Sequence, residues 1–253
     1  MLPECTVCAL FCGDYPELLE RCLKPLVTLS PFTFRLRLAC NGISHRSGDV
    51  FGNLVRQAQP GLIDIISISE ENIYKYPQMR RILRGGDPGS FPIETPWMMW
   101  MDDDSGVSAP DPTARLQQVL QDAKDANADM MGSIWTMTLT PDQIDWVKKQ
   151  PWYNKRPVDG RMAFCTGGSW IVKTDILCKH QWPPPDCIHR GGDVMLGQLM
   201  YQQNYKIKNY KSKDGLLINA DMSGKECSSK KRVANFYPIG HKNANQPRPL
   251  TDP

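Results

Sequence analysis

The feature that most constrains this chain is an apolar run that ends abruptly in three acidic residues. Residues 96–101, Pro-Trp-Met-Met-Trp-Met, have no polar face, and Asp102, Asp103 and Asp104 follow directly. A run of this kind is typical of a strand that is buried on both faces of a sheet. Open α/β sheets bind ligands at the carboxyl ends of their strands. The sequence therefore predicts a central strand that delivers carboxylates to a binding edge.

Apolar periodicity predicts further strands and helices that alternate along the chain. Strands are expected at residues 6–13, 34–40, 62–68 and 130–139, with late strands at 205–211 and 216–219. Helices are expected from Pro16, over 49–59, after Pro77, from Pro112, over 141–150 and within 189–203. The alternation predicts one α/β domain over residues 1–242, with a mainly parallel central sheet flanked by helices, and a polar tail over 243–253.

Composition places the chain among soluble globular proteins. No apolar stretch approaches the roughly 18 residues that a membrane span needs. The nine cysteines are scattered through apolar segments, and the N-terminus has no basic region before its first apolar run. We therefore expect free thiols, no membrane span and a cytoplasmic, reducing location.

Charge is distributed unevenly, although the formal net charge is only +3. Residues 1–150 hold 14 Lys and Arg against 19 Asp and Glu, whereas residues 151–253 hold 16 against 8. A basic half with aromatic residues is one way to hold an anionic partner such as nucleic acid, and surface lysines in water are the alternative. The residues concerned are Lys206, Lys208, Lys211, Lys213, Lys225, Lys230, Lys231 and Arg232, with Tyr205, Tyr210 and Trp170 as candidate stacking residues.

The three aspartates point to a divalent cation. Alternate residues of an extended chain share a face, so Asp102 and Asp104 are expected to act together while Asp103 points elsewhere. Carboxylates packed together raise one another's pKa unless a cation neutralises them. Mg²⁺ and Mn²⁺ are hard ions that bind oxygen ligands of this kind. The alternative is an acidic turn that merely follows a strand.

An apolar strand that ends in Asp-x-Asp in mid-domain resembles the glycosyltransferases of the GT-A fold, especially their family-2-like group. Residues 6–23 resemble the opening strand and helix of that group, whose junction binds the nucleotide base, and residues 36–44 resemble its second strand. Two departures stand out. Gly13-Asp14-Tyr15 replaces the usual Thr-Tyr-Asn, and residues 39–42 lack the acidic residue that commonly meets uracil.

The resemblance implies a nucleotide-sugar donor, with a UDP-sugar expected first, and a role for each matching residue. Donor contacts fall to Arg80 or Arg81, to Asp102 and Asp103, and to Lys242 at the diphosphate. The metal ligands are Asp102, Asp104 and a late histidine, His241. The acceptor segment is Gly167, Gly168, Ser169 and Trp170, for which a bulged strand with a core tryptophan is the alternative. Asp193 is the general base, or else only the N-cap of a helix.

Several acceptors and one other reaction remain open. The acceptor is a hydroxyl group, and the uneven charge makes a hydroxymethylated DNA base one candidate, as for virus-encoded enzymes of this type that act in a host cell. A glycan, a lipid-linked sugar or a protein side chain are the other candidates. Asp102-x-Asp104 also resembles the nucleophile motif of haloacid-dehalogenase phosphatases, in which Asp102 attacks phosphorus. A non-catalytic sugar or nucleotide binder is the third class.

Overall fold

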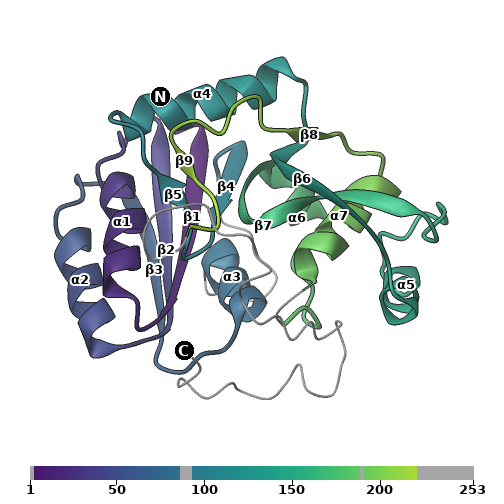
Figure 1. Ribbon diagram of the computed structural model, residues 1–253, viewed down its shortest axis with the longest axis horizontal. Helices are drawn as coiled ribbons and strands as arrows, with labels where there is room; N and C mark the ends of the chain where they lie inside the picture. The colour runs from purple at the N-terminus through teal and green to yellow at the C-terminus, as the bar shows by residue number, and fades with distance from the viewer. Residues whose placement is uncertain (1–2, 86–92, 189–190, 221–253) are drawn as a thin grey trace.

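The computed structural model describes residues 3–85, 93–188 and 191–220. Within these ranges the chain builds one large sheet and one small sheet (Figure 1). The strands of the large sheet are β1 (Cys5–Gly13), β2 (Phe34–Ile43), β3 (Ile63–Ser69), β4 (Trp97–Met101), β6 (Met130–Thr138), β7 (Arg161–Lys173) and β8 (Ile207–Asn209). The small sheet pairs β5 (Gly106–Val107) with β9 (Leu216–Leu217) in antiparallel fashion.

The large sheet has the order β3-β2-β1-β4-β7-β6-β8 and is mixed. Strands β3, β2, β1 and β4 are parallel, β7 is antiparallel to both β4 and β6, and β8 is parallel to β6. The predicted α/β fold with a mainly parallel sheet is thus confirmed, and β7 is the strand that reverses. Side-chain periodicity locates a strand but carries no information about its direction.

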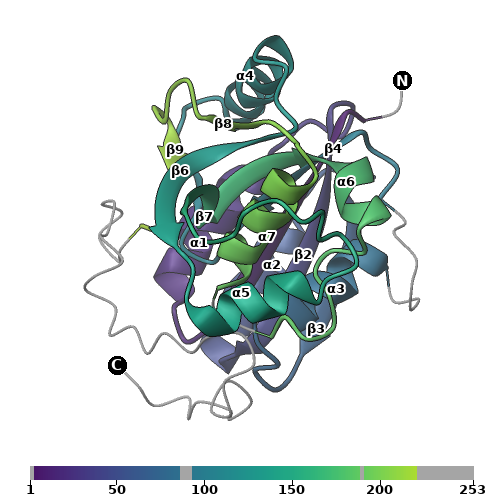
Figure 2. The same ribbon diagram turned by 90° about the vertical axis from the view of Figure 1, so that its right-hand side faces the viewer.

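Helices cover both faces of the sheet (Figures 1 and 2). One face is covered by α1 (Pro16–Leu26), α2 (His45–Val55) and α4 (Pro112–Asp125). The other is covered by α3 (Lys75–Arg84), α5 (Pro141–Lys148), α6 (Thr174–Lys179) and α7 (Gly192–Gln202). In the part of the chain that the structure describes, no helix is long and apolar enough to cross a membrane.

Two helices begin earlier than the sequence predicts, and both differences have a local cause. Helix α2 begins at His45 because the Ser44 side chain accepts a hydrogen bond from the backbone N–H of Ser47. Helix α3 begins at Lys75, ahead of Pro77, because a proline is tolerated in the first turn, where its missing N–H has no partner to lose. The earlier start of α3 matters for function, because it places Lys75 and Tyr76 on that helix.

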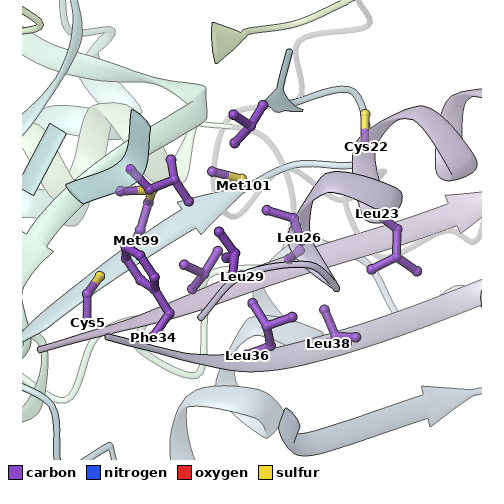
Figure 3. Close-up of a cluster of buried hydrophobic side chains, with 14 of the residues drawn as sticks. Cys5, Cys22, Leu23, Leu26, Leu29, Phe34, Leu36, Leu38, Met99 and Met101 are labelled. Atoms are coloured by element: carbon purple, nitrogen blue, oxygen red, sulfur yellow. The ribbon is translucent and has the colours of Figure 1, made fainter. Parts of the chain in front are cut away.

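Strand β4 is the centre of the core. All of its side chains are buried, and they alternate between the two faces of the sheet. Trp97, Met99 and Met101 pack against the side of α1, α2 and α4, part of which Figure 3 shows, whereas Met98 and Trp100 pack against the side of α3 and α7. The predicted strand buried on both faces is therefore confirmed. Each such side chain contributes about 1.5–3 kcal/mol by burial, which fixes the end of β4 firmly.

Most of the described cysteines are buried in this core, whereas Cys178 is exposed. Cys5 and Cys8 face opposite sides of the sheet, so they do not converge on a metal ion. Every cysteine that the structure describes is a free thiol, as expected.

Candidate active site

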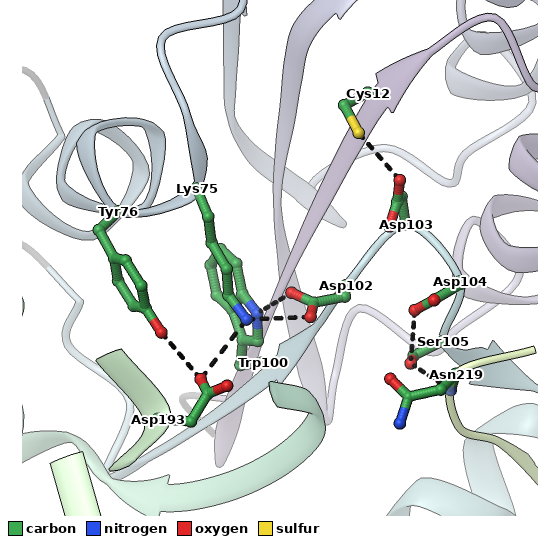
Figure 4. A network of polar contacts seen from close by, with 10 residues as sticks. All are labelled: Cys12, Lys75, Tyr76, Trp100, Asp102, Asp103, Asp104, Ser105, Asp193 and Asn219. Atoms are coloured by element: carbon green, nitrogen blue, oxygen red, sulfur yellow. Dashed lines mark hydrogen bonds and ion pairs between the residues drawn. The ribbon is translucent and has the colours of Figure 1, made fainter. Parts of the chain in front are cut away.

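The candidate site lies at the carboxyl edge of the sheet, where β4 ends. The backbone N–H of Asp102 donates to the carbonyl of Gly168 at 2.9 Å and so ties this end of β4 to β7. Both carboxylate oxygens of Asp102 are engaged (Figure 4). Oδ1 accepts a hydrogen bond from Trp100 Nε1 at 2.7 Å, and Oδ2 lies 2.9 Å from the ammonium of Lys75. Strand β4 and helix α3 therefore meet at a partly buried ion pair.

A second carboxylate meets the same ammonium. Lys75 Nζ lies 3.6 Å from Oδ1 of Asp193, which stands in the first turn of α7. The phenol of Tyr76 donates to that same oxygen at 2.8 Å. Three elements that are distant in the sequence thus converge through Asp102, Lys75 and Asp193, and Figure 4 shows the ammonium between the two carboxylates.

The start of α3 is held in place by a pair of asparagines. Asn41 Oδ1 accepts from the N–H of Ile73 at 2.8 Å, while Asn72 Oδ1 accepts from the N–H of Tyr74 at 2.9 Å and from Asn41 Nδ2 at 2.8 Å. Tyr74 is held at φ 70° and ψ 170°, a conformation that costs a non-glycine residue about 1–3 kcal/mol. The surrounding contacts impose this backbone path, which aims the next residue, Lys75, at the site.

The electrostatics of the site follow from burial and an excess of negative charge. Burial, together with the nearby Asp104 and Asp193, raises the pKa of Asp102 to about 6 against the opposing effect of Lys75. Burial alone would lower the pKa of Lys75, but Asp102 and Asp193 raise it above its ordinary value. Burial and Asp193 also raise the pKa of Tyr76, so its phenol stays protonated and remains a donor.

The other two aspartates of the motif take different directions. Asp103 Oδ2 accepts from the thiol of Cys12, at the end of β1, at 2.9 Å. Asp104 is buried, with 2% of its surface exposed, and its Oδ1 accepts from Ser105 Oγ at 3.4 Å. Its carbonyl accepts from the N–H of Ala220 at 2.7 Å, so the last described residue lies against the motif. Asp103 thus points away from Asp102, as expected, whereas Asp104 contacts Ser105 and Ala220, and the joint action of Asp102 and Asp104 stays a prediction.

The described residues do not by themselves fit a metal ion. Within them, no group of three or more His, Cys, Asp or Glu side chains is placed to hold one. Both oxygens of Asp102 already have partners, Trp100 and Lys75. The predicted third ligand, His241, and the predicted diphosphate contact, Lys242, lie outside the described residues.

Asp193 is not the N-cap of α7. The N-cap is Gly191, and the side chain of Asp193 points toward Lys75 and Tyr76. The geometry therefore rules out the hypothesis that Asp193 is only the N-cap of a helix. Its role as general base stays a prediction.

The predicted donor arginines differ in their surroundings. Arg80 Nη1 donates to the carbonyls of Pro184 and Cys187, each at 2.8 Å, so it anchors the segment that leads to α7. Arg81 is exposed on α3. Donor binding by Arg80 or Arg81 stays a prediction. Arg80 also has a structural role that the sequence did not predict.

The predicted acceptor segment lies in β7, beside Asp102. Trp170 is 1% exposed and stacks on Trp100 with ring centroids 6.3 Å apart. It is therefore a core residue, and in this conformation it offers no face to a sugar. Ser169 is buried and shares a hydrogen bond with Tyr210. Gly167 also lies in this strand, and a Cβ at Gly168 would come within 2.4 Å of Asn219 Oδ1, so close packing requires the glycine.

Sequence reasoning missed Lys75 and Tyr76. The helix was expected to begin only after Pro77, which left both residues in a loop with no partner. The same apolar periodicity could have placed Tyr76 on the helix, because it precedes Met79 and Leu83 on the buried face of α3, but it gives no signal for Lys75.

A mixed sheet of this order, covered by helices on both faces and with aspartates at its carboxyl edge, has the GT-A fold of nucleotide-sugar glycosyltransferases. Among solved structures it is similar to the mannosyltransferase PcManGT from Pyrobaculum calidifontis in complex with GDP-Man and Mn²⁺, with TM-score 0.53 and 12% identity, over 83% of this chain and 55% of that one. It is also similar to TarS from S. aureus, with TM-score 0.54 and 10% identity, over 84% of this chain and 36% of that one.

A third similar structure is TarS 1–349 in complex with UDP, with TM-score 0.51 and 12% identity, over 83% of this chain and 59% of that one. The chain thus spans between 36% and 59% of the length of these proteins. No protein-family model matches the sequence, and no curated protein matches it either. At such low identity the likeness shows the fold alone.

Proposed function

We propose that this chain is a glycosyltransferase that takes a sugar from a nucleotide-sugar donor. One observation carries the proposal: Asp102 at the end of β4 and Asp193 at the start of α7 meet one ammonium, that of Lys75, at the carboxyl edge of a GT-A sheet. Ligands of open α/β sheets bind at this edge. Similar structures that hold GDP-Man or UDP support the choice of donor class.

In this proposal Asp193 is the general base. Its carboxylate takes the proton of the acceptor hydroxyl while the hydroxyl oxygen attacks the anomeric carbon of the sugar. The bond from that carbon to the nucleotide diphosphate breaks, and its electron pair leaves with the diphosphate. The reaction so written inverts the anomeric centre. Asp193 suits the role because it is partly exposed, with 24% of its side chain accessible, while Lys75 and Tyr76 hold it from the other side.

Metal dependence is a separate part of the proposal. Mn²⁺ or Mg²⁺ remains the expected cofactor from the Asp-x-Asp pattern, and the similar mannosyltransferase was solved with Mn²⁺. Since the described residues form no donor set, we assign no step of the reaction to the metal. Transfer measured in EDTA and in Mn²⁺ tests the expectation, and equal rates in the two solutions would contradict metal dependence.

The acceptor is proposed to be a hydroxyl compound, and a hydroxymethylated DNA base stays among the candidates. Exposed Lys206, Lys208 and Lys213 surround the short strand β8, in keeping with an anionic partner, and Lys211 lies 3.8 Å from Asp122. Tyr210 is buried, so it offers no stacking face to a base. Glycan, lipid-linked and protein acceptors therefore belong in the same screen.

The deciding experiment is a donor screen with the purified chain. UDP-, GDP- and CMP-sugars are incubated with Mn²⁺ or EDTA, with and without hydroxymethylated duplex DNA, and release of the nucleotide is measured. We expect one nucleotide class to be turned over. If none is hydrolysed and none binds in calorimetry, the proposal fails.

The phosphatase alternative is tested in the same assay with nitrophenyl phosphate. A nucleophilic Asp102 needs an accessible oxygen, whereas both oxygens are held by Trp100 and Lys75. We expect no phosphate release.

A further inference from the structure

Lys75 and Tyr76 both contact the same oxygen of Asp193. The phenol of Tyr76 donates to Oδ1 at 2.8 Å, and the ammonium of Lys75 lies 3.6 Å from Oδ1. Within the described ranges, the closest contact of each of these two partners with Asp193 is therefore made to Oδ1. The carboxylate is therefore held through Oδ1, while 24% of the Asp193 side chain stays accessible.

We propose that Lys75 and Tyr76 are positioning residues that hold Oδ1 of Asp193 and so present Oδ2 to the acceptor hydroxyl. The inference rests on the proposed function and adds to it the residues that orient the base. A general base works only when it lies within hydrogen-bond reach of the proton it removes. A carboxylate fixed through one oxygen keeps the other in a defined direction, whereas an unfixed carboxylate turns about its side-chain bonds.

Tyr76 can fix Asp193 because its own ring is closely packed. A Cβ built on Gly192 would lie 2.1 Å from Cζ of the Tyr76 ring, so the ring is packed directly on the backbone at the start of α7. The backbone N–H of Tyr76 donates to the carbonyl of Ile188 at 3.2 Å, and Trp182 contacts the ring edge-on with centroids 6.5 Å apart. The phenol is thus held at a set distance from the residue that follows Gly192.

Lys75 fixes Asp193 from the other side and links it to Asp102. Its ammonium lies 5.6 Å from the centroid of the Tyr76 ring and 5.9 Å from that of Trp100. One positive charge is shared by two carboxylates, which repel each other when it is removed. Lys75 therefore sets the distance between the end of β4, where the donor is proposed to bind, and the base.

The test is Tyr76→Phe, which removes the hydroxyl and keeps the ring on Gly192. We expect kcat to fall roughly ten- to a hundredfold, because a small misplacement of a reacting group costs up to about 10²-fold, while KM for the donor is unchanged. Tyr201→Phe is the matched control, because this ring on α7 lies against Arg156, away from Asp193, and we expect the wild-type kcat. The same change in an Asp193→Asn background should cost nothing further. A wild-type kcat for Tyr76→Phe, or an equal loss in both backgrounds, overturns the inference.

A crystal structure of the Tyr76→Phe variant tests the positioning without any assay. An Asp193 carboxylate turned away from its wild-type direction supports the inference, and an unmoved carboxylate contradicts it. A wild-type chain that turns over no nucleotide-sugar defeats the proposed function instead. The two failures are therefore distinguishable.

Discussion

Two lysine–aspartate pairs stand at opposite ends of β4, and each lies beside a tryptophan of that strand. At the start of the strand, Lys173 lies 2.8 Å from Asp129 and 6.0 Å from the centroid of the Trp97 ring. At its end, Lys75 lies 2.9 Å from Asp102 and 5.9 Å from the centroid of the Trp100 ring. The pairs have nearly the same local geometry, so any difference in behaviour comes from their surroundings.

The surroundings differ in charge balance. Burial would raise the pKa of Asp129, but the hydrogen bond from Lys173 and a second one from the backbone N–H of Lys206 lower it below its ordinary value. Burial raises the pKa of Asp102 to about 6 in spite of Lys75. The ammonium of Lys173 serves one carboxylate, whereas that of Lys75 serves two. A balanced pair is a structural clamp, and a partly buried pair with excess negative charge is typical of a functional site.

The largest expected effect is the loss of transfer when Asp193, the proposed general base, is replaced. We predict that Asp193→Asn lowers kcat for transfer by about 10²–10⁴-fold, since an amide cannot take the acceptor proton. Thermal unfolding should be close to wild type. Asp175→Asn is the control, because Asp175 also stands in the first turn of a helix, α6, and is exposed. Equal transfer rates of the two variants would show that Asp193 is not the general base.

The second prediction compares the lysines themselves. Lys75→Met should lower kcat at least about tenfold, because both carboxylates lose their shared cation, and Lys75→Arg should restore part of it. Lys173→Met removes an equally close pair and should leave kcat unchanged. Its cost should appear in chemical denaturation, as a loss of about 1 kcal/mol or less. Equal loss of transfer in both methionine variants would contradict the claim that Lys75 has a functional role and Lys173 only a structural one.

The third prediction concerns the backbone under the Tyr76 ring. Gly192→Ala should destabilise the chain by about 1–3 kcal/mol and lower transfer, because the added methyl group overlaps the ring. Gly160→Ala is the control, since a Cβ there meets no atom within 4 Å. Denaturation midpoints and transfer rates of the two variants settle the point. A fully active, stable Gly192→Ala would show that Tyr76 has room to move.

Strand β4 was within reach of the sequence, and the site at its end only in part. The run 96–101 predicts a doubly buried strand because every side chain in it is apolar, and Pro112 predicts the start of α4 because proline suits the first helical position. Both signals are local. The aspartates after β4 mark the binding edge for the same reason.

The shared ammonium could not be read from the sequence, because it depends on how α3 and α7 lie over the sheet. Lys75 and Asp193 are distant in the chain, and only the path imposed at Tyr74 brings them together. The buried stacking of Trp170 on Trp100 is likewise a contact between strands that pair antiparallel, and strand direction is not encoded in periodicity. Local patterns thus predict elements and edges, while the chemistry of the edge depends on tertiary contacts.

The smallest expected effect is the pH dependence of the clamp. Because the pKa of Asp129 is lower in the folded chain than its ordinary value, its pair stabilises the fold at neutral pH and loses that contribution as the pH falls below about 4. Asp129→Asn should therefore be less stable than wild type by about 1 kcal/mol or less at pH 7, and the difference should shrink at pH 3. Urea denaturation at the two pH values measures it. Transfer at pH 7 should be the same in both chains, since Asp129 lies at the opposite end of β4 from Asp193. A difference that grows toward pH 3 would mean that Asp129 is not held by its lysine, and the clamp would then be no reference for the site.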